Sequence, residues 1–287
     1  MPGVKDRVIV ITGAGGGLGR TYALLLARAG ARVVVNDLGG ARDGSGSGTT
    51  MADGVVAEIR GAGGEAVASY DSVATEEGAA ALVRTAVDAF GTVHGLVSNA
   101  GILRDRSFAR MTAGEWEAVQ HVHLFGAFHV TRAVWPYFRQ QEYGRVVMAT
   151  STSGLYGSFG QANYGAAKAG LVGLTHTLAV EGAKYNILTN AVAPLASTRM
   201  TEDVTPPELQ GKLDPAFVAP VVGHLLTEEC TDSGTVVVAG GGEVHRTRLY
   251  RSRGASFDFV PTIEQVAERW GEITDMEGAL PGTNPLG

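Results

Sequence analysis

The chain is poor in cysteine, and it has neither an excess of basic residues nor a long apolar run. Cys230 is the only cysteine among 287 residues, which excludes an internal disulfide and favours a reducing compartment. Lys and Arg number 23 against 29 Asp and Glu and are not gathered in runs, so the composition predicts neither nucleic acid nor a membrane surface as a partner. The apolar segment near the N-terminus is too short to span a bilayer and lacks the form of a secretory signal.

The two ends of the sequence also lack familiar targeting and linker features. The last residues do not have the Ser-Lys-Leu form of a peroxisomal address, so we expect a cytoplasmic protein. No Pro/Ser-rich linker divides the chain. We therefore expect one catalytic domain over residues 1–242, followed by an extension over residues 243–287 that packs on the domain or on a partner subunit. The extension has no strand periodicity and one plausible helix, Thr262–Trp270.

Short β-branched runs alternate along the chain with longer helical patterns. This alternation predicts a doubly wound α/β (Rossmann) domain, with seven parallel strands in one sheet and helices on both faces. The spacing of Thr112 and Glu115 predicts a capping box that opens one long helix. The expected strands are 8–12, 32–37, 66–71, 93–99, 145–151, 187–194 and 235–239.

A glycine-rich turn, "TGAGGGLG" at residues 12–19, joins the first strand to the first helix. Without Cβ atoms the backbone can approach a pyrophosphate, and the helix N-terminus supplies N–H donors to it. Asp37 lies about 20 residues further on, where a carboxylate can accept hydrogen bonds from the adenosine ribose and repel a 2′-phosphate. The sequence therefore predicts NAD in preference to NADP. Asp71 and Ser72 are candidates for the adenine end of this site, or for the start of a helix.

Tyr164 and Lys168 are four residues apart in a segment of small residues, "ANYGAAKAGLVGL". On a helix this spacing puts them on one face, where the ammonium would favour the phenolate and allow Tyr164 to exchange a proton with an alcohol. Loop 38–50 is rich in glycine; it either faces a ligand or is a mobile surface loop, and the second interpretation is favoured. No metal site is expected, because His121 and His123 are two residues apart and point to different faces of a helix.

The glycine turn, "SNAG" at residues 98–101, Ser151 and the Tyr164/Lys168 pair resemble the short-chain dehydrogenase/reductase family in order and spacing, over about residues 5–242. The resemblance implies that Tyr164 is the general acid/base and that Ser151 hydrogen-bonds the substrate oxygen. It implies that Lys168 lowers the tyrosine pKa and holds the nicotinamide ribose. The cofactor-binding residues that it implies are Gly13, Gly15, Gly17, Leu18, Gly19, Asp37, Asp71, Ser72, Asn99, Ala100, Gly101, Tyr164, Lys168, Pro194, Ser197 and Thr198.

Four further segments, "VVVNDLGG", "NAGILRDRSFARM", "VHLFG" and "SGLYGSFGQANYGAAK", resemble the (3R)-hydroxyacyl-CoA dehydrogenases of that family. This likeness implies interconversion of a (3R)-hydroxyacyl-CoA and a 3-oxoacyl-CoA with NAD. A 17β-hydroxysteroid dehydrogenase, a 3-oxoacyl carrier-protein reductase and a non-catalytic NAD-binding regulatory protein are the alternatives.

The resemblance also implies a substrate lid at residues 199–217 and a homodimer or homotetramer formed through the helices that begin near Thr112 and Gln161. His123 stands where the family usually has a catalytic asparagine, and we expect it to be a satisfied histidine at a helix interface. The arginines at 104, 106 and 110 either meet CoA phosphates or pair on the surface with Asp105, and we favour the pairing.

Overall fold

The structure of the chain is a computed structural model that describes residues 3–197 and 212–283. The chain divides into two compact units, Met1–His245 and Arg246–Gly287. The first unit carries the central sheet and all the residues predicted to be functional. Among the described residues, no helix is both long enough and apolar enough to cross a membrane.

One sheet of eight strands forms the centre of the first unit, in the order β3-β2-β1-β4-β5-β6-β7-β8. The seven predicted strands are confirmed and pair in parallel, with ends that differ from the prediction by at most two residues. Their bounds are β1 Val8–Thr12, β2 Arg32–Asn36, β3 Glu65–Ser69, β4 Gly95–Ser98, β5 Gly144–Ala149, β6 Ile187–Leu195 and β7 Val236–Gly240.

The sheet has one strand more than the seven predicted, β8 (Glu243–Thr247), in the segment without strand periodicity. Its residues, "EVHRT", are almost all exposed, because β8 lies at the edge of the sheet. A strand with no buried face has no apolar alternation, so no pattern in the sequence predicted it.

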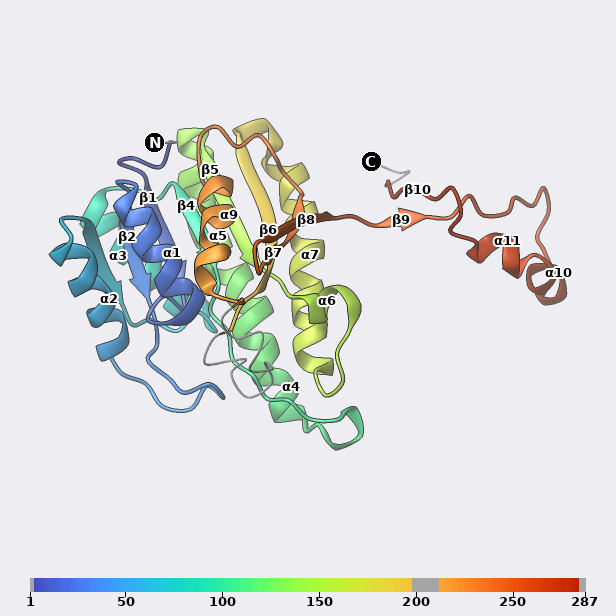
Figure 1. Cartoon of the computed structure of the whole chain (residues 1–287), viewed down its shortest axis with the longest axis horizontal. Coiled ribbons are helices and arrows are strands. Elements are labelled where there is room, and N and C mark those ends of the chain that lie inside the picture. Colours follow the sequence, from blue (N-terminus) through green and yellow to red (C-terminus); the bar gives the residue numbers. More distant parts are fainter. Residues whose placement is uncertain (1–2, 198–211, 284–287) are drawn as a thin grey trace. The chain divides into compact units, whose positions relative to one another are not determined.

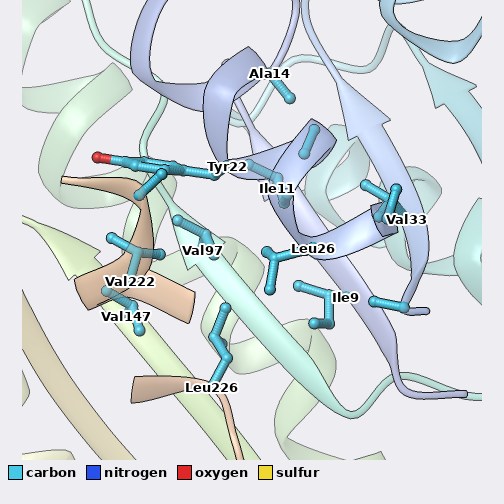
Figure 2. Close-up of a cluster of buried hydrophobic side chains, with 14 of the residues drawn as sticks. Ile9, Ile11, Ala14, Tyr22, Leu26, Val33, Val97, Val147, Val222 and Leu226 are labelled. Carbon is cyan, nitrogen blue, oxygen red and sulfur yellow. The ribbon is translucent and has the colours of Figure 1, made fainter. Parts of the chain in front are cut away.

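Helices cover both faces of the sheet, as predicted (Figure 1). On one face, α1 (Gly17–Arg28), α2 (Thr50–Gly61) and α9 (Ala219–Leu225) share a core with β1, which is buried along its whole length. Figure 2 shows Ile9 and Ile11 of β1 in this core beside Leu26 of α1. On the other face lie α3 (Glu76–Phe90), α5 (Gly126–Gln141) and α7 (Ala162–Gly182).

The capping box at Thr112 is confirmed. The Thr112 Oγ1 accepts a hydrogen bond from the Glu115 N–H at 3.2 Å, and Glu115 Oε2 accepts one from the Thr112 N–H at 2.9 Å. The box opens α4 (Ala113–Gln120), which runs through a π-helical turn, η2 (His121–Phe125), into α5. The predicted single helix is therefore interrupted by one wider turn.

The remaining elements are short. In the second unit, the predicted helix Thr262–Trp270 extends too far. The chain forms α10 (Ile263–Glu268) and then a separate helix, α11 (Trp270–Thr274). There β9 (Tyr250–Arg251) pairs antiparallel with β10 (Leu280–Pro281). The first unit also holds η1 (Phe108–Arg110), α6 (Thr152–Tyr156), η3 (Ala183–Tyr185) and η4 (Pro215–Phe217).

The strand order reverses at β1, which lies between β2 and β4. In open α/β sheets the helices diverge at such a point, and ligands bind there beyond the carboxyl ends of the strands. The segments that follow β1, β2 and β4 therefore meet at one edge of the sheet.

Candidate active site

At Gly13 and Gly19, neighbouring backbone leaves no room for a side chain in the glycine turn after β1. A Cβ at Gly19 would lie 2.2 Å from the Gly13 carbonyl oxygen, and one at Gly13, whose φ is +64°, would lie 2.8 Å from the Cα of Ala100. The helix α1 then begins without a side-chain cap. A cradle of this kind, with backbone N–H groups at a helix N-terminus, fits a pyrophosphate.

Asp37, directly after β2, is held by two backbone donors. Its Oδ2 accepts a hydrogen bond from the Gly15 N–H at 2.9 Å, and its Oδ1 accepts one from the Gly39 N–H at 2.7 Å. Gly15 thus orients Asp37, and it does not line the cavity described below. Because an ionised carboxylate has about four acceptor positions, Asp37 can accept further bonds from ribose hydroxyls.

Asn99 joins the end of β4 to the glycine turn. Its Nδ2 donates to the carbonyl oxygens of Thr12 and Gly13 at 3.0 and 3.2 Å. In return the Thr12 Oγ1 accepts from the N–H groups of Asn99 and Ala100 at 2.9 and 3.0 Å. The sequence reasoning did not name Thr12, although it stands directly before the first glycine of the turn.

Asp71 and Ser72, after β3, complete this edge of the sheet. The Asp71 carbonyl accepts from Asn36 Nδ2 at 2.9 Å, and its carboxylate accepts from the Ser69 hydroxyl at 2.9 Å. The helix α3 is capped by Thr75, so neither candidate residue starts it. Of the two interpretations, the adenine end of the site is the one that agrees with their place in the cavity wall.

A cavity of about 570 Å³ lies over these segments. Its size is in the range of ligand sites in general. Among the predicted cofactor residues, Gly15, Gly19, Tyr164, Lys168, Pro194 and Ser197 do not line it, and Thr198 lies outside the described residues. The predicted residues that line the cavity are Gly13, Gly17, Leu18, Asp37, Asp71, Ser72, Asn99, Ala100 and Gly101.

Ser151, Tyr164 and Lys168 come together beside this cavity. Ser151 follows β5, caps α6 and shares a side-chain hydrogen bond with Tyr164. Lys168, one turn after Tyr164 on α7, places its Nζ 5.4 Å from the centre of the Tyr164 ring and donates to the Ala149 carbonyl. The arrangement offers a hydroxyl donor and a phenol to the same substrate oxygen.

Burial dominates the electrostatics of this trio. It lowers the pKa of Lys168 from 10.5 to about 7. Burial also raises the pKa of Tyr164 above its usual value; Ser151 opposes this through its hydrogen bond, and Asp105 adds to it. In this structure Ser151 supplies the effect that lowers the Tyr164 pKa, and the lowering by Lys168 stays a prediction. At neutral pH Tyr164 is a phenol, the form that donates a proton to a ketone.

His123, in the π-helical turn, lies between the cavity wall and Tyr164. Its ring meets the Tyr164 ring edge-on, with centroids 5.1 Å apart, and a Cβ at Gly101 would be 2.3 Å from its Cε1. Its Nε2 lies 3.0 Å from the Ile102 nitrogen and 2.8 Å from the Ile102 oxygen, whereas Nδ1 has no hydrogen-bond partner among the described residues. The expected place at a helix interface is confirmed by the contact of η2 with Tyr164 of α7, whereas the expected hydrogen bonding is met at Nε2 alone.

The protonation of His123 follows from its surroundings. Burial, and then the nearby charge of Lys168, hold its pKa well below the usual value. The imidazole is therefore neutral at physiological pH. Because its ring contacts Gly101 of the cavity and Tyr164 of the trio, His123 joins the two parts of the site.

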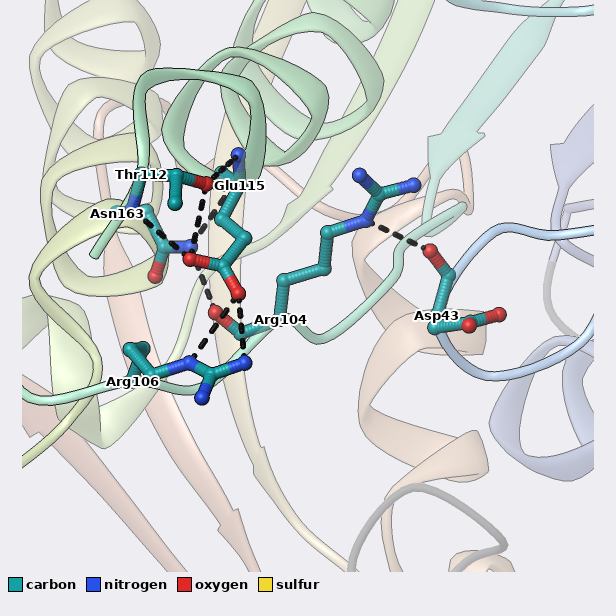
Figure 3. Close-up of polar contacts among 6 residues, drawn as sticks. All are labelled: Asp43, Arg104, Arg106, Thr112, Glu115 and Asn163. Carbon is teal, nitrogen blue, oxygen red and sulfur yellow. Dashed lines mark hydrogen bonds and ion pairs between the residues drawn. The ribbon is translucent and has the colours of Figure 1, made fainter. Parts of the chain in front are cut away.

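Asn163, directly before Tyr164, is fully buried and was missed by the sequence reasoning. Its Nδ2 donates to the carbonyl oxygens of Arg104 and Glu115 at 3.0 and 3.1 Å (Figure 3). Its Oδ1 accepts from the Tyr164 N–H at 2.7 Å. The start of α7 is thereby fixed to α4 and to the segment after β4. The sequence signal for this role was the position of Asn163, a polar amide among small residues directly before the tyrosine.

The expected pairing of these arginines with Asp105 is wrong for Arg104 and Arg106, which have other partners. Arg106 pairs with Glu115, Nη2 to Oε1, at 3.0 Å, and Arg104 donates from Nε to the Asp43 carbonyl at 3.0 Å. Asp105 instead accepts from Gln161 at 2.9 Å. Among the described residues, no three His, Cys, Asp or Glu side chains form a group that could hold a metal ion.

A fold with a dinucleotide cradle and a Ser-Tyr-Lys trio defines a nicotinamide-dependent oxidoreductase acting on CH–OH groups. The family model for short chain dehydrogenases matches residues 7–209, and the chain belongs to this family. The residues present fit the nicotinamide cofactor that the family implies, because the glycine cradle, Asp37 and the cavity lie together.

Several relatives resemble almost the whole chain. A short-chain type dehydrogenase/reductase of Mycobacterium tuberculosis is 67% identical over 279 residues, which cover 97% of this chain and 98% of that protein. A hydroxyacyl-CoA dehydrogenase of the same organism is 38% identical over 276 residues, 89% of this chain and 86% of that protein.

A solved structure resembles the fold closely. The peroxisomal multifunctional enzyme type 2 of Drosophila melanogaster superposes with a TM-score of 0.82 at 42% identity and covers 99% of this chain. The chain spans 48% of that protein.

Proposed function

We propose that this chain interconverts a (3R)-hydroxyacyl-CoA and the matching 3-oxoacyl-CoA, with NAD as its cofactor. The observation that carries the proposal is the Ser151, Tyr164 and Lys168 trio beside a dinucleotide cavity that contains Asp37. The substrate class is supported by the likeness to a hydroxyacyl-CoA dehydrogenase.

Each residue of the trio has a separate role in the proposed reaction. Tyr164 exchanges a proton with the substrate oxygen, and Ser151 donates a hydrogen bond to that oxygen and stabilises its developing charge. Lys168 lies one helical turn away and would hold the nicotinamide ribose. The nicotinamide, when bound, accepts or supplies the hydride. The chain itself contributes orientation, proton transfer and exclusion of water.

The preference for NAD rests on Asp37. Its carboxylate is fixed at the end of β2, where it would accept hydrogen bonds from ribose hydroxyls and repel a 2′-phosphate. Arg42 and Arg104 line the same cavity, and their positive charges would attract a 2′-phosphate. Because the two backbone bonds hold Asp37 in one position, we expect its repulsion to decide the choice.

The decisive assay measures NADH formation with (3R)- and (3S)-hydroxyacyl-CoA of several chain lengths. We expect turnover of the 3R isomer and tighter binding of NADH than of NADPH. Preference for the 3S isomer, or inactivity with every acyl-CoA, contradicts the substrate proposal. Turnover of a 17β-hydroxysteroid alone supports that alternative, whereas NADPH-dependent reduction of an oxoacyl carrier protein supports a reductase.

The Tyr164→Phe variant separates catalysis from binding. Loss of the proton-exchanging hydroxyl is expected to lower kcat by a factor of about 100 to 10,000, because that is the usual contribution of general acid–base catalysis. NADH binding, followed by its fluorescence, should be retained. Normal turnover by Tyr164→Phe overturns the assignment of the base, and binding without turnover in the wild type supports a non-catalytic NAD-binding protein.

The compartment, the assembly and the domain bounds of the protein are part of the proposal. We propose a cytoplasmic homodimer or homotetramer that needs no metal, nucleic acid or membrane. The catalytic domain is proposed to cover residues 1–242, with residues 243–287 packing on it or on a partner subunit. The proposed lid, 199–217, lies largely outside the described residues; of its described part, Pro215–Phe217 form η4.

A further inference from the structure

The glycine-rich segment after β2, Leu38–Gly48, crosses to the segment after β4; we call it the strap. The Leu103 N–H donates to the Arg42 carbonyl at 3.0 Å, and Arg104 Nε donates to the Asp43 carbonyl at 3.0 Å. Gly44 packs on Ile102, since a Cβ at Gly44 would be 3.1 Å from Ile102 Cγ2. Because β1 lies between β2 and β4, the strap passes the glycine turn that follows β1.

The strap is an ordered part of the cavity wall. The Gly48 N–H donates to the Leu38 carbonyl at 2.9 Å, and the Ala41 N–H donates to the Ser45 carbonyl at 2.7 Å. The cavity is lined by five strap residues as well as by the glycine turn. Of the two interpretations of this segment, the ligand-facing one agrees with its place in the cavity wall. The five residues are Leu38, Gly40, Ala41, Arg42 and Gly44.

The anchor of the strap continues into the catalytic helix. Figure 3 shows Arg104 extending its side chain to Asp43 from the cluster around Asn163. The Arg104 carbonyl accepts from Asn163 Nδ2, and Asn163 Oδ1 accepts from the Tyr164 N–H. The position of Arg104 is thus fixed by the same buried amide that holds the backbone of Tyr164.

We propose that the strap retains the bound nicotinamide dinucleotide. Arg104, whose backbone is held by Asn163, is the positioning residue: its hydrogen bond to the Asp43 carbonyl, which we call the clasp, holds the strap closed over the cofactor. A cofactor lying between the glycine turn and the strap leaves only when the strap separates from Ile102–Arg104. The clasp therefore sets the dissociation rate of the cofactor. This inference rests on the nicotinamide cofactor of the proposed function and is independent of the substrate.

The first test compares two glycines of the strap by stopped-flow fluorescence of NADH dissociation, with excess NAD as the displacing ligand. Gly44 and Gly46 both have positive φ, +85° and +74°, so alanine strains the backbone at either position. Only the Cβ at 44 would meet Ile102; the one at 46 has nothing within 4 Å. We expect Gly44→Ala to release NADH faster than Gly46→Ala. Equal rates in these two variants overturn the proposal.

The second test separates the clasp from simple charge attraction at Arg104. Glutamine places its Nε2 at the same distance along the side chain as Arg Nε, so Arg104→Gln keeps the donor without the charge, while Arg104→Met keeps neither. Loss of one hydrogen bond is expected to raise the dissociation rate about two- to tenfold in Arg104→Met. Arg104→Gln should stay close to the wild type. Equal acceleration in both variants shows that Arg104 acts by charge and overturns the clasp.

The double variant Gly44→Ala/Arg104→Met tests whether both changes act through one contact. Because either change alone releases the strap, the pair should accelerate dissociation no more than the larger single effect. Independent, multiplying effects contradict the proposal. Failure of the wild type to bind NADH at all overturns the cofactor assignment of the proposed function together with the strap, whereas normal binding with unchanged variant rates overturns the strap alone.

Discussion

The buried ammonium of Lys168 lowers the free energy of unfolding by an amount that depends on pH. Its pKa falls from 10.5 to about 7 in the folded chain because burial disfavours the charged form. Between these two pH values the unfolded state binds more protons than the folded state, so this group makes stability rise with pH. Below about pH 7 both states are protonated and the penalty is complete; above about pH 10.5 it vanishes.

We therefore expect Lys168→Met to abolish turnover yet to stabilise the fold. At pH 6 the gain in the free energy of unfolding should be on the order of 1 kcal/mol or more, and it should shrink as the pH approaches 10. Urea unfolding at several pH values measures it. Lys184→Met, at an exposed lysine of η3, is the matched control and should show little change. A gain that is the same at every pH would contradict the assignment of the cost to the buried charge.

The roles that follow from local spacing could be predicted from the sequence. Tyr164 and Lys168 are one helical turn apart, and the glycine turn is a contiguous pattern, so both are visible without the fold. Asn163 and Thr12 act through contacts with segments far away in the chain, and no local pattern contains those contacts. The raised pKa of Tyr164 was equally invisible, because it depends on burial.

The π-helical turn η2 is the element that brings a histidine into the site. Such turns are wider than an α-helical turn and often mark functional positions. His123, at the middle of η2, is buried against both Gly101 and Tyr164 while its Nε2 bonds the Ile102 backbone. The turn, "HVHLF", contains neither proline nor glycine to mark a break, which is why the sequence predicted an uninterrupted helix.

Variants of His123 should separate its backbone bond from its ring contact. His123→Phe keeps an aromatic ring beside Tyr164 but leaves the buried Ile102 backbone groups without their partner, a cost of about 1–3 kcal/mol in stability. His123→Gln can keep a polar atom near Ile102 and should lose less. Thermal unfolding of the two variants measures the difference, and a His123→Phe protein as stable as the wild type would refute the role of this bond.

The pH dependence of turnover provides an independent check on the same histidine. Because burial and Lys168 hold the pKa of His123 well below its usual value, the ring stays neutral from about pH 6 to 8. The pH profile of kcat/KM in His123→Gln should therefore keep the wild-type shape while its height falls. A wild-type inflection near pH 6.5 that disappears in this variant would show instead that His123 titrates during turnover.

For the whole molecule, composition and periodicity predicted more of the first unit than of the second. Seven buried strands alternate with amphipathic helices over residues 8–240, and these produce strong periodic signals. The unit Arg246–Gly287 contains short elements with mostly exposed side chains, and β8, which runs across the boundary at His245, has no buried face. Sequence patterns report burial, so elements that bury little leave no pattern to find.

The proposed association between copies of the chain concerns the molecule as a whole. The helices proposed to mediate it expose large apolar side chains: Phe128, on α5, is 43% exposed, and Val180, on α7, is 79% exposed. Apolar side chains of this size gain free energy when a partner covers them. A homodimer or homotetramer would have twice or four times the chain mass of 29.8 kDa, which is 59.6 or 119.2 kDa.

Light scattering at micromolar concentration should therefore give one of these two masses for the wild type. Val180→Glu places a charge on the exposed face of α7, where association would have to bury it, and should shift the mass toward 29.8 kDa. Ala57→Glu makes the same change on the exposed face of α2, outside the helices proposed to associate, and should keep the wild-type mass. Circular dichroism of both variants controls for folding. A wild-type mass of one chain contradicts the proposed oligomer, and an unchanged mass in Val180→Glu contradicts the use of this end of α7.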